Sequence, residues 1–238
     1  MFDPFKDFET AGYLRNRFYE KNLDIVREIE HTMFRAGLDD AINYLSQRQQ
    51  LTYSDFKEVH KILFFEFYPW AGKDRYEIAP NLAISKANTQ FCHPLDLERA
   101  VVEGLKIGHD KKQMAKRPGE VMGYFAYGHP FLDGNGRTML IIHSELCHRA
   151  GFCIDWQQTK KMEYLSALSK EIASPGNNHL DSYLSNFIVP SRDRLEWGGS
   201  IGQVKGLDGS HEQDLVEGEY SNKEVLSKYR EFELNRNK

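Results

Sequence analysis

Apolar residues recur at intervals of three and four positions along most of the chain, which is the pattern of amphipathic α-helices. For example, Met162, Leu165, Leu168 and Ile172 fall on one face of a predicted helix. The same periodicity predicts helices over residues 23–35, 54–66, 95–107, 119–127, 138–150, 158–173 and 180–189. A chain of this kind is expected to be mainly α, with its helices assembled as a bundle.

Residues 75–92 interrupt this helical pattern. The segment contains Ala79, Pro80 and Asn81, followed by Ile84, and it lacks an apolar repeat of three or four. Proline and asparagine favour tight turns, so we expect a short β-hairpin with its turn at Pro80-Asn81. A hairpin beside a binding site can act as a flap that takes up an extended segment of a target protein as an added strand.

The character of the sequence changes at Pro190. Residues 197–209 are rich in glycine and are predicted to be a linker, and residues 222–235 are charged and predicted to form an exposed helix. These features divide the chain into a domain over residues 1–190 and a C-terminal tail over residues 191–238. Two interpretations of the tail stay open: a solvated segment that folds back on the domain, and a docking or secretion element.

Composition excludes several classes of protein. The 238 residues carry a net charge of −4 and no basic stripe with interleaved aromatics, so a nucleic-acid partner is not expected. No apolar run reaches the roughly 20 residues of a membrane helix, and the first residues lack the layout of a secretory signal. The three cysteines, an odd number without metal-site spacing, favour a cytoplasmic location.

The most informative stretch is residues 129–138, which read HPFLDGNGRT and lead into a predicted helix. Pro130 disfavours helical angles at the residue before it, so His129 is expected just past the end of the preceding helix. Gly134 and Gly136 permit positive φ angles and leave no side chain in the way. Their amides and the amino terminus of the following helix are expected to form a cradle for phosphate.

Four side chains of this loop suit chemistry on a nucleotide phosphate. His129 titrates near neutral pH and can take a proton from an attacking hydroxyl. Asp133 is a hard oxygen ligand suited to Mg²⁺. Arg137 offers a planar fork to phosphate oxygens, and Asn135 can donate a hydrogen bond to the nucleotide. Taken singly, each has an ordinary explanation as a cap, a core residue or a surface turn. Their close spacing before a helix favours the functional explanation.

This stretch resembles the signature of the Fic (filamentation induced by cAMP) family, His-Pro-Phe-x-Asp/Glu-Gly-Asn-Gly-Arg-x-x-Arg. Residues 63–75, which end in Trp-Ala-Gly-Lys-Asp-Arg, and residues 13–17 resemble further segments of the same domain. The resemblance implies a Fic-like helical bundle with a short β-hairpin flap beside the active-site loop. It also implies a protein adenylyltransferase, which uses Mg²⁺ and ATP to move AMP onto a Ser, Thr or Tyr hydroxyl of a target protein.

The resemblance also assigns roles to the residues of the loop. His129 is then the catalytic base, Asp133 holds the metal, and the target protein docks at the flap over residues 75–92. Four positions bind the ATP: Gly134, Asn135, Gly136 and Arg137. A separate small inhibitory partner protein stays open, as does delivery of the chain into another cell as an effector.

One position departs from the family pattern, because Leu140 stands where the signature has its second arginine. In the family this arginine contacts the γ-phosphate and pairs with the glutamate of an inhibitory Ser/Thr-x-x-x-Glu-Gly/Asn helix. Ser227 and Glu231 have that spacing, but Phe232 follows them. We therefore expect no such glutamate lock. Truncation at Pro190 is expected not to raise activity, and Leu140→Arg is expected to tighten ATP binding by roughly 1–2 kcal/mol.

Two alternatives to AMP transfer stay open at this point. Leu140 fits a Fic-like transferase of another phosphate-containing group, such as phosphate or a different nucleotide. It also fits a weakly active, nucleotide-binding relative.

Overall fold

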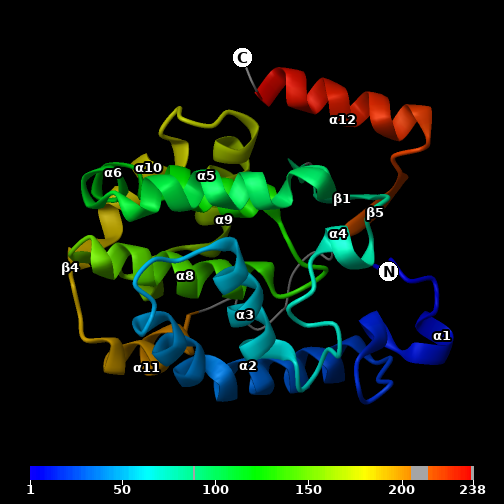
Figure 1. Cartoon of the computed structure of the whole chain (residues 1–238), viewed down its shortest axis with the longest axis horizontal. Helices are drawn as coiled ribbons and strands as arrows, with labels where there is room; N and C mark the ends of the chain where they lie inside the picture. Colours follow the sequence, from blue (N-terminus) through cyan, green and yellow to red (C-terminus); the bar gives the residue numbers. More distant parts are fainter. Residues whose placement is uncertain (88, 205–213, 237–238) are drawn as a thin grey trace.

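The computed structural model describes residues 1–87, 89–204 and 214–236, and this part of the chain is mainly helical (Figure 1). The helices are α1 Phe8–Ala11, α2 Leu23–Ser46, α3 Tyr53–Phe64, α4 Arg75–Ile78, α5 Leu97–His109, α6 Lys111–Lys116, α7 Pro118–Gly128, α8 Asn135–Arg149, α9 Lys161–Ala173, α10 His179–Leu184, α11 Trp197–Ile201 and α12 Lys223–Arg236. The strands are β1 Leu82–Lys86, β2 Thr89–Gln90, β3 Phe152–Ile154, β4 Ile188–Pro190 and β5 Leu215–Glu219. The predicted helical bundle with a small hairpin is confirmed. No helix in the described part of the chain is long and apolar enough to cross a membrane.

Helix α7 lies at the centre of the bundle. All of its residues except Tyr124 are buried, and it packs against α5, α8, α9 and α10. Glycine permits the close approach of α10, since a Cβ atom on Gly119 would lie 2.3 Å from the backbone nitrogen of Asp181. Helix α8 follows α7 along the chain and buries Ile141 and Leu146 completely. The loop that joins the two helices is therefore anchored at both ends in the core.

Apolar periodicity locates most helices correctly but misplaces some of their ends. Helix α2 extends well past residue 35, because its buried stripe continues through Leu38. Helix α3 begins after Thr52, whose amide donates to the Asp55 carboxylate at 2.7 Å and so caps the helix. The prediction of a helix over residues 180–189 is wrong in its second half, where β4 pairs antiparallel with β3.

The flap forms within residues 75–92, but its predicted turn at Pro80-Asn81 is wrong. These two residues instead separate the short helix α4 from β1. Strands β1 and β2 pair antiparallel with Lys86 opposite Thr89, so the chain reverses between these two residues. Proline and asparagine mark the end of a helix as well as a turn, which is why the sequence alone misplaced the reversal.

The C-terminal part of the chain contributes more to the fold than a linker and tail. Trp197 and Ile201, the ends of α11, are both 4% exposed and belong to the main core, so the linker prediction is wrong there. Residues 205–209 of that prediction lie outside the described residues. Strand β5 then pairs with β1, which gives a sheet of order β2-β1-β5. The predicted exposed helix is confirmed as α12, which lies across the top of Figure 1 and has no buried residue.

Candidate active site

His129 ends α7 in a left-handed conformation, with φ 43° and ψ 60°. A residue with a side chain keeps such angles only where its surroundings hold it there. The buried guanidinium of Arg75 does so, because its Nε donates to the His129 carbonyl at 2.7 Å. Its Nη2 also donates to the carbonyls of Gly128 at 3.1 Å and Cys92 at 3.0 Å. Arg75 ends the Trp-Ala-Gly-Lys-Asp-Arg segment, so the sequence marked this residue without revealing its role.

The side chain of Asn135 closes the middle of the loop. Its Oδ1 accepts from the Phe131 amide at 2.9 Å, and its Nδ2 donates to the Phe131 carbonyl at 2.7 Å. The Phe131 ring is buried and stacks on His60, with 3.7 Å between the ring centroids. Both polar atoms of the Asn135 side chain thus shape the loop, which differs from the predicted contact with the nucleotide.

Two glycines prepare the amino terminus of α8. Gly134 precedes the helix with φ 75°, and a Cβ atom there would lie 2.5 Å from the Phe64 ring. Gly136 lies in the first turn, where an added Cβ would meet nothing within 4 Å, so this face of the turn is open. The first amides of a helix lack carbonyl partners one turn earlier and favour anions. The predicted phosphate cradle therefore has the backbone that it needs.

The two charged side chains of the loop differ in exposure. The side chain of Asp133 is 32% exposed and its Oδ1 accepts from the Gly134 amide at 2.6 Å. The side chain of Arg137 is only 6% exposed, with Nη2 3.6 Å from Oδ1 of Asp133. Its guanidinium lies 4.7 Å from the centroid of the Phe64 ring. Asp133 is accessible to an ion from solvent, whereas Arg137 is buried against the Phe64 ring.

Glu30, which no sequence motif singled out, binds Arg137. Its Oε1 accepts from Nη2 of Arg137 at 2.8 Å, although Glu30 is only 2% exposed. Burial raises the pKa of Glu30 to about 7, and the attraction of Arg137 opposes that rise. On α2, Val26, Glu30 and Phe34 are all buried at intervals of four residues. A carboxylate within an apolar stripe was the signal that could have revealed this ion pair.

The His129 ring is enclosed by an aromatic side chain and a carboxylate. It stacks on Phe91 with 3.6 Å between centroids, and its Nε2 lies 2.6 Å from Oδ2 of Asp214, just before β5. The other oxygen of Asp214 lies 3.2 Å from Nζ of Lys86 on β1. Burial lowers the pKa of His129 against the opposing effect of Asp214. A lowered pKa favours the neutral imidazole, the form that accepts a proton.

The loop of residues 129–138 offers a magnesium ion one carboxylate ligand, that of Asp133. Across residues 1–87, 89–204 and 214–236, no cluster of three or more His, Cys, Asp or Glu side chains is arranged to hold a metal. A magnesium ion usually keeps several waters and takes further ligands from substrate phosphates, so a single accessible carboxylate next to a phosphate cradle suits it.

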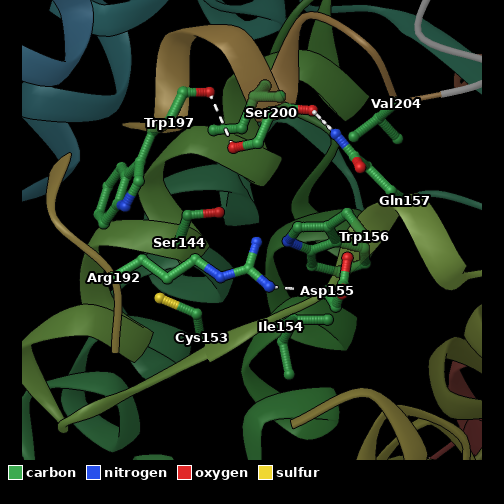
Figure 2. Close-up of a pocket in the computed structure, with 11 residues that line it drawn as sticks. Ser144, Cys153, Ile154, Asp155, Trp156, Gln157, Arg192, Trp197, Ser200 and Val204 are labelled. Carbon is green, nitrogen blue, oxygen red and sulfur yellow. Dashed lines mark hydrogen bonds and ion pairs between the residues drawn. The ribbon is translucent and has the colours of Figure 1, made fainter. Parts of the chain in front are cut away.

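A cavity elsewhere in the fold is too small to be the nucleotide site. It has a volume of about 40 Å³ and is lined by Ser144, Trp156, Arg192 and Trp197 among others (Figure 2). Arg192 reaches across it to Asp155, with 3.5 Å between Nη2 and Oδ2. A space of this size holds a few water molecules, and no residue of the loop 129–138 lines it.

Solved structures with the same architecture define the class of this fold. The BepC effector of Bartonella tribocorum, solved with bound AMPPNP, superposes with a TM-score of 0.62 at 17% identity, over 74% of this chain and 92% of that chain. The N-terminal Fic domain of a Bartonella quintana effector, solved with bound ADP, gives a TM-score of 0.65 at 18% identity, over 79% and 96% of the two chains. The fold is that of a Fic domain.

Sequence comparison leads to the same family. Residues 50–147 match the model of the Fic/DOC family. The protein adenylyltransferase VbhT of Bartonella schoenbuchensis is 30% identical over 173 residues, which are 69% of this chain and 35% of the relative. The probable protein adenylyltransferase y4lH of Sinorhizobium fredii is 25% identical over 67% of this chain and 83% of its own length. The chain belongs to the Fic/DOC family, and it spans about a third of the length of VbhT.

Proposed function

We propose that this chain is a protein adenylyltransferase, which moves AMP from ATP to a Ser, Thr or Tyr hydroxyl of a target protein. One observation carries the proposal: the loop between α7 and α8 holds a buried histidine, an accessible carboxylate and an open helix amino terminus. Membership of the Fic/DOC family supports it, as do the two relatives named as adenylyltransferases.

The phosphates of ATP bind at the amino terminus of α8. The amides of residues 135 and 136 and the helix dipole attract their negative charge, while the Gly134 amide donates to Asp133. Asp133 holds Mg²⁺, which when bound neutralises part of the phosphate charge. Arg137 adds positive charge from beneath the loop, where its ion pair with Glu30 fixes its position.

His129 accepts the proton of the target hydroxyl. The hydroxyl oxygen forms a bond to the α-phosphorus, its proton passes to Nε2 of His129, and the bond between the α-phosphorus and pyrophosphate breaks. The hydrogen bond from Arg75 to the His129 carbonyl fixes the backbone that aims the ring. The protein forms no covalent intermediate in this scheme, so positioning and charge stabilisation supply the rate.

Position 140 favours one second candidate function. Leu140 is 5% exposed and belongs to the apolar core. Leu140→Arg would bury a charge there, so we now expect it to destabilise the fold instead of tightening ATP binding. Arg137 is then the one arginine of the signature available to the donor. This favours, as the second candidate, transfer of another phosphate-containing group from a donor without a γ-phosphate.

Parallel labelling separates the two candidates. Purified protein is incubated with cell lysate and with ATP labelled at either the α- or the γ-phosphate, with His129→Ala as the inactive control. AMP transfer predicts protein-bound label from the α position alone. Label from the γ position alone would indicate phosphate transfer from ATP, which neither candidate predicts. No label from either position would contradict AMP transfer and leave the second candidate, whose donor lacks a γ-phosphate.

We place this reaction in a cytoplasm, with the target segment docked on the flap. Cys92, Cys147 and Cys153 are all free thiols, which suits a reducing compartment. The solved relatives include VirB-translocated Bartonella effectors, so the cytoplasm of a recipient cell is a second setting. The chain can be expressed in a secreting and in a non-secreting strain. Detection of labelled protein in the producing cells and in the recipient cells then tests this choice.

A further inference from the structure

The flap edge nearest to His129 is already covered by the chain itself. Strand β5 runs antiparallel to β1, with Leu82 opposite Glu219 and Ser85 opposite Leu215. In Figure 1 the orange strand β5 returns beside the cyan-green β1 from the far end of the sequence. An extended target segment that adds a strand to this edge needs the same backbone groups of β1. The C-terminal strand therefore stands in the place of the target.

Asp214, the residue before β5, extends the overlap with the target's binding place as far as the ring of His129. Its Oδ2 lies 2.6 Å from Nε2 of His129, and its Oδ1 lies 3.2 Å from Nζ of Lys86. A hydroxyl that gives its proton to a histidine needs an oxygen about 2.6–3.2 Å from the ring nitrogen. The carboxylate oxygen of Asp214 thus occupies the position that the proposed function gives to the target hydroxyl.

The segment after residue 213 is attached at the surface of the domain. The Tyr229 hydroxyl accepts from the His93 amide at 3.1 Å, and Nε of Arg236 donates to the Ile172 carbonyl at 3.1 Å. The Arg236 guanidinium also lies 3.6 Å from the centroid of the Tyr127 ring. Helix α12 buries none of its residues, although Val216 and Phe232 pack against the core and Tyr220 is buried. The segment is therefore expected to detach at a lower free-energy cost than the core helices.

We propose that β5 is an intramolecular pseudosubstrate. It occupies the edge of β1 to which a target segment would bind, and it puts Asp214 where the hydroxyl-bearing residue of the target binds. This inference rests on the proposed function, and it adds the register in which a target segment pairs with β1. A target segment runs antiparallel to β1, and its modified residue comes directly before the residue opposite Ser85. The sequence alone predicts that removing the C-terminal tail does not raise activity, and the contact of Asp214 with His129 predicts the opposite.

Replacing Asp214 in the full chain tests both parts of the proposal. Asp214→Ser puts a hydroxyl near Nε2 of His129, so we expect AMP from α-labelled ATP to become attached at position 214. The yield per molecule is expected to be independent of protein concentration, because the acceptor belongs to the same chain. Asp214→Ala has no hydroxyl to modify. It loses the carboxylate that binds His129, so we expect its labelling of lysate proteins to exceed that of the wild type by about tenfold or more, as 1.4 kcal/mol of lost docking gives.

Peptide mapping by mass spectrometry locates the label, and hydrogen exchange of α7 amides shows that each variant keeps its core. The double variant Asp214→Ser with His129→Ala controls for labelling that does not use the histidine, and Ser221→Ala controls for label elsewhere in the segment. Equal lysate labelling by wild type and Asp214→Ala, with no label at position 214 of Asp214→Ser, would overturn the pseudosubstrate and leave the proposed function standing. No labelling by any variant would instead overturn the proposed function, together with the inference that rests on it.

Discussion

The loop of residues 129–138 contains His129, and the C-terminal segment of residues 214–236 contacts it through Asp214. The two regions differ in how firmly they are packed against the rest of the protein. The loop lies between two buried helices, and Phe131 and Leu132 within it are at most 1% exposed. The C-terminal segment adds one strand to the flap and an exposed helix without a buried residue. Regions with few buried contacts open at a lower free-energy cost than the core. The loop is therefore a firmly held part of the proposed reaction site, and the C-terminal segment is expected to open first.

The largest effect is expected where the two regions meet. His129→Ala removes the proposed base and also the contact for Asp214, so AMP transfer should fall by about 10²–10⁴-fold. Binding of ATP should stay within a few-fold of the wild type, because the phosphate cradle belongs to α8. Transfer of α-label and isothermal titration with ATP measure the two quantities. Turnover close to that of the wild type would remove His129 from the mechanism.

A smaller loss is expected when only the loop is changed. Asp133→Ala removes the one accessible carboxylate of the loop, and we expect a decrease in transfer of roughly a hundredfold or more, with no stimulation by Mg²⁺. Asp214→Asn is the matched change in the C-terminal segment, and it should not lower transfer. Strong stimulation of Asp133→Ala by millimolar Mg²⁺ would show that the ion binds elsewhere.

Stability should distinguish the two glycines of the loop. Gly134→Ala forces a side chain towards the Phe64 ring at a positive φ angle, so we expect a loss of about 1–3 kcal/mol in the free energy of unfolding. In a domain of this size that lowers the Tm by several degrees. Gly136→Ala meets open space and should leave the Tm unchanged. Thermal unfolding of both variants provides the test, and equal Tm values would mean that the loop adjusts freely.

The smallest effect belongs to the C-terminal segment. Tyr229→Phe removes the acceptor of the His93 amide, which should weaken docking of α12 by about 0.5–1.5 kcal/mol. We expect faster hydrogen exchange in α12 and no change in α7 or in the main thermal transition. A fall in the overall Tm would show instead that this segment unfolds together with the core.

The features that the sequence predicted are those set by neighbouring residues. Helices α5, α7 and α9 follow local apolar repeats, and the turn after α7 follows from Pro130 and the two glycines of the loop. The pairing of β5 with β1 joins Leu82 to Glu219 across most of the chain, and its charged, glycine-containing strand has no clear alternation. No local pattern could reveal that partner.

The candidate site likewise has some features that the sequence predicted and others that it did not. The roles expected for His129 and Asp133 rest on a compact motif and fit the observed geometry. The ion pair of Glu30 with Arg137 depends on how α2 packs against α8, and the contact of Asp214 depends on strand pairing. Both partners are set by tertiary structure. The position of Glu30 within an apolar stripe of α2 was a local signal for the first, and no local pattern pointed to the second.

Arg75 has a consequence for how a substrate is chosen. Its guanidinium binds the carbonyls of His129 and of Cys92, the residues that flank the reaction loop and the end of the flap hairpin. The hairpin and the histidine are therefore expected to keep a constant spacing. A target strand that slips by one residue along β1 moves its side chain by about 3.3 Å and turns it to the opposite face. If the proposed docking on β1 holds, the position of a residue along the target segment is expected to decide whether it is modified, and the identity of the surrounding side chains becomes secondary.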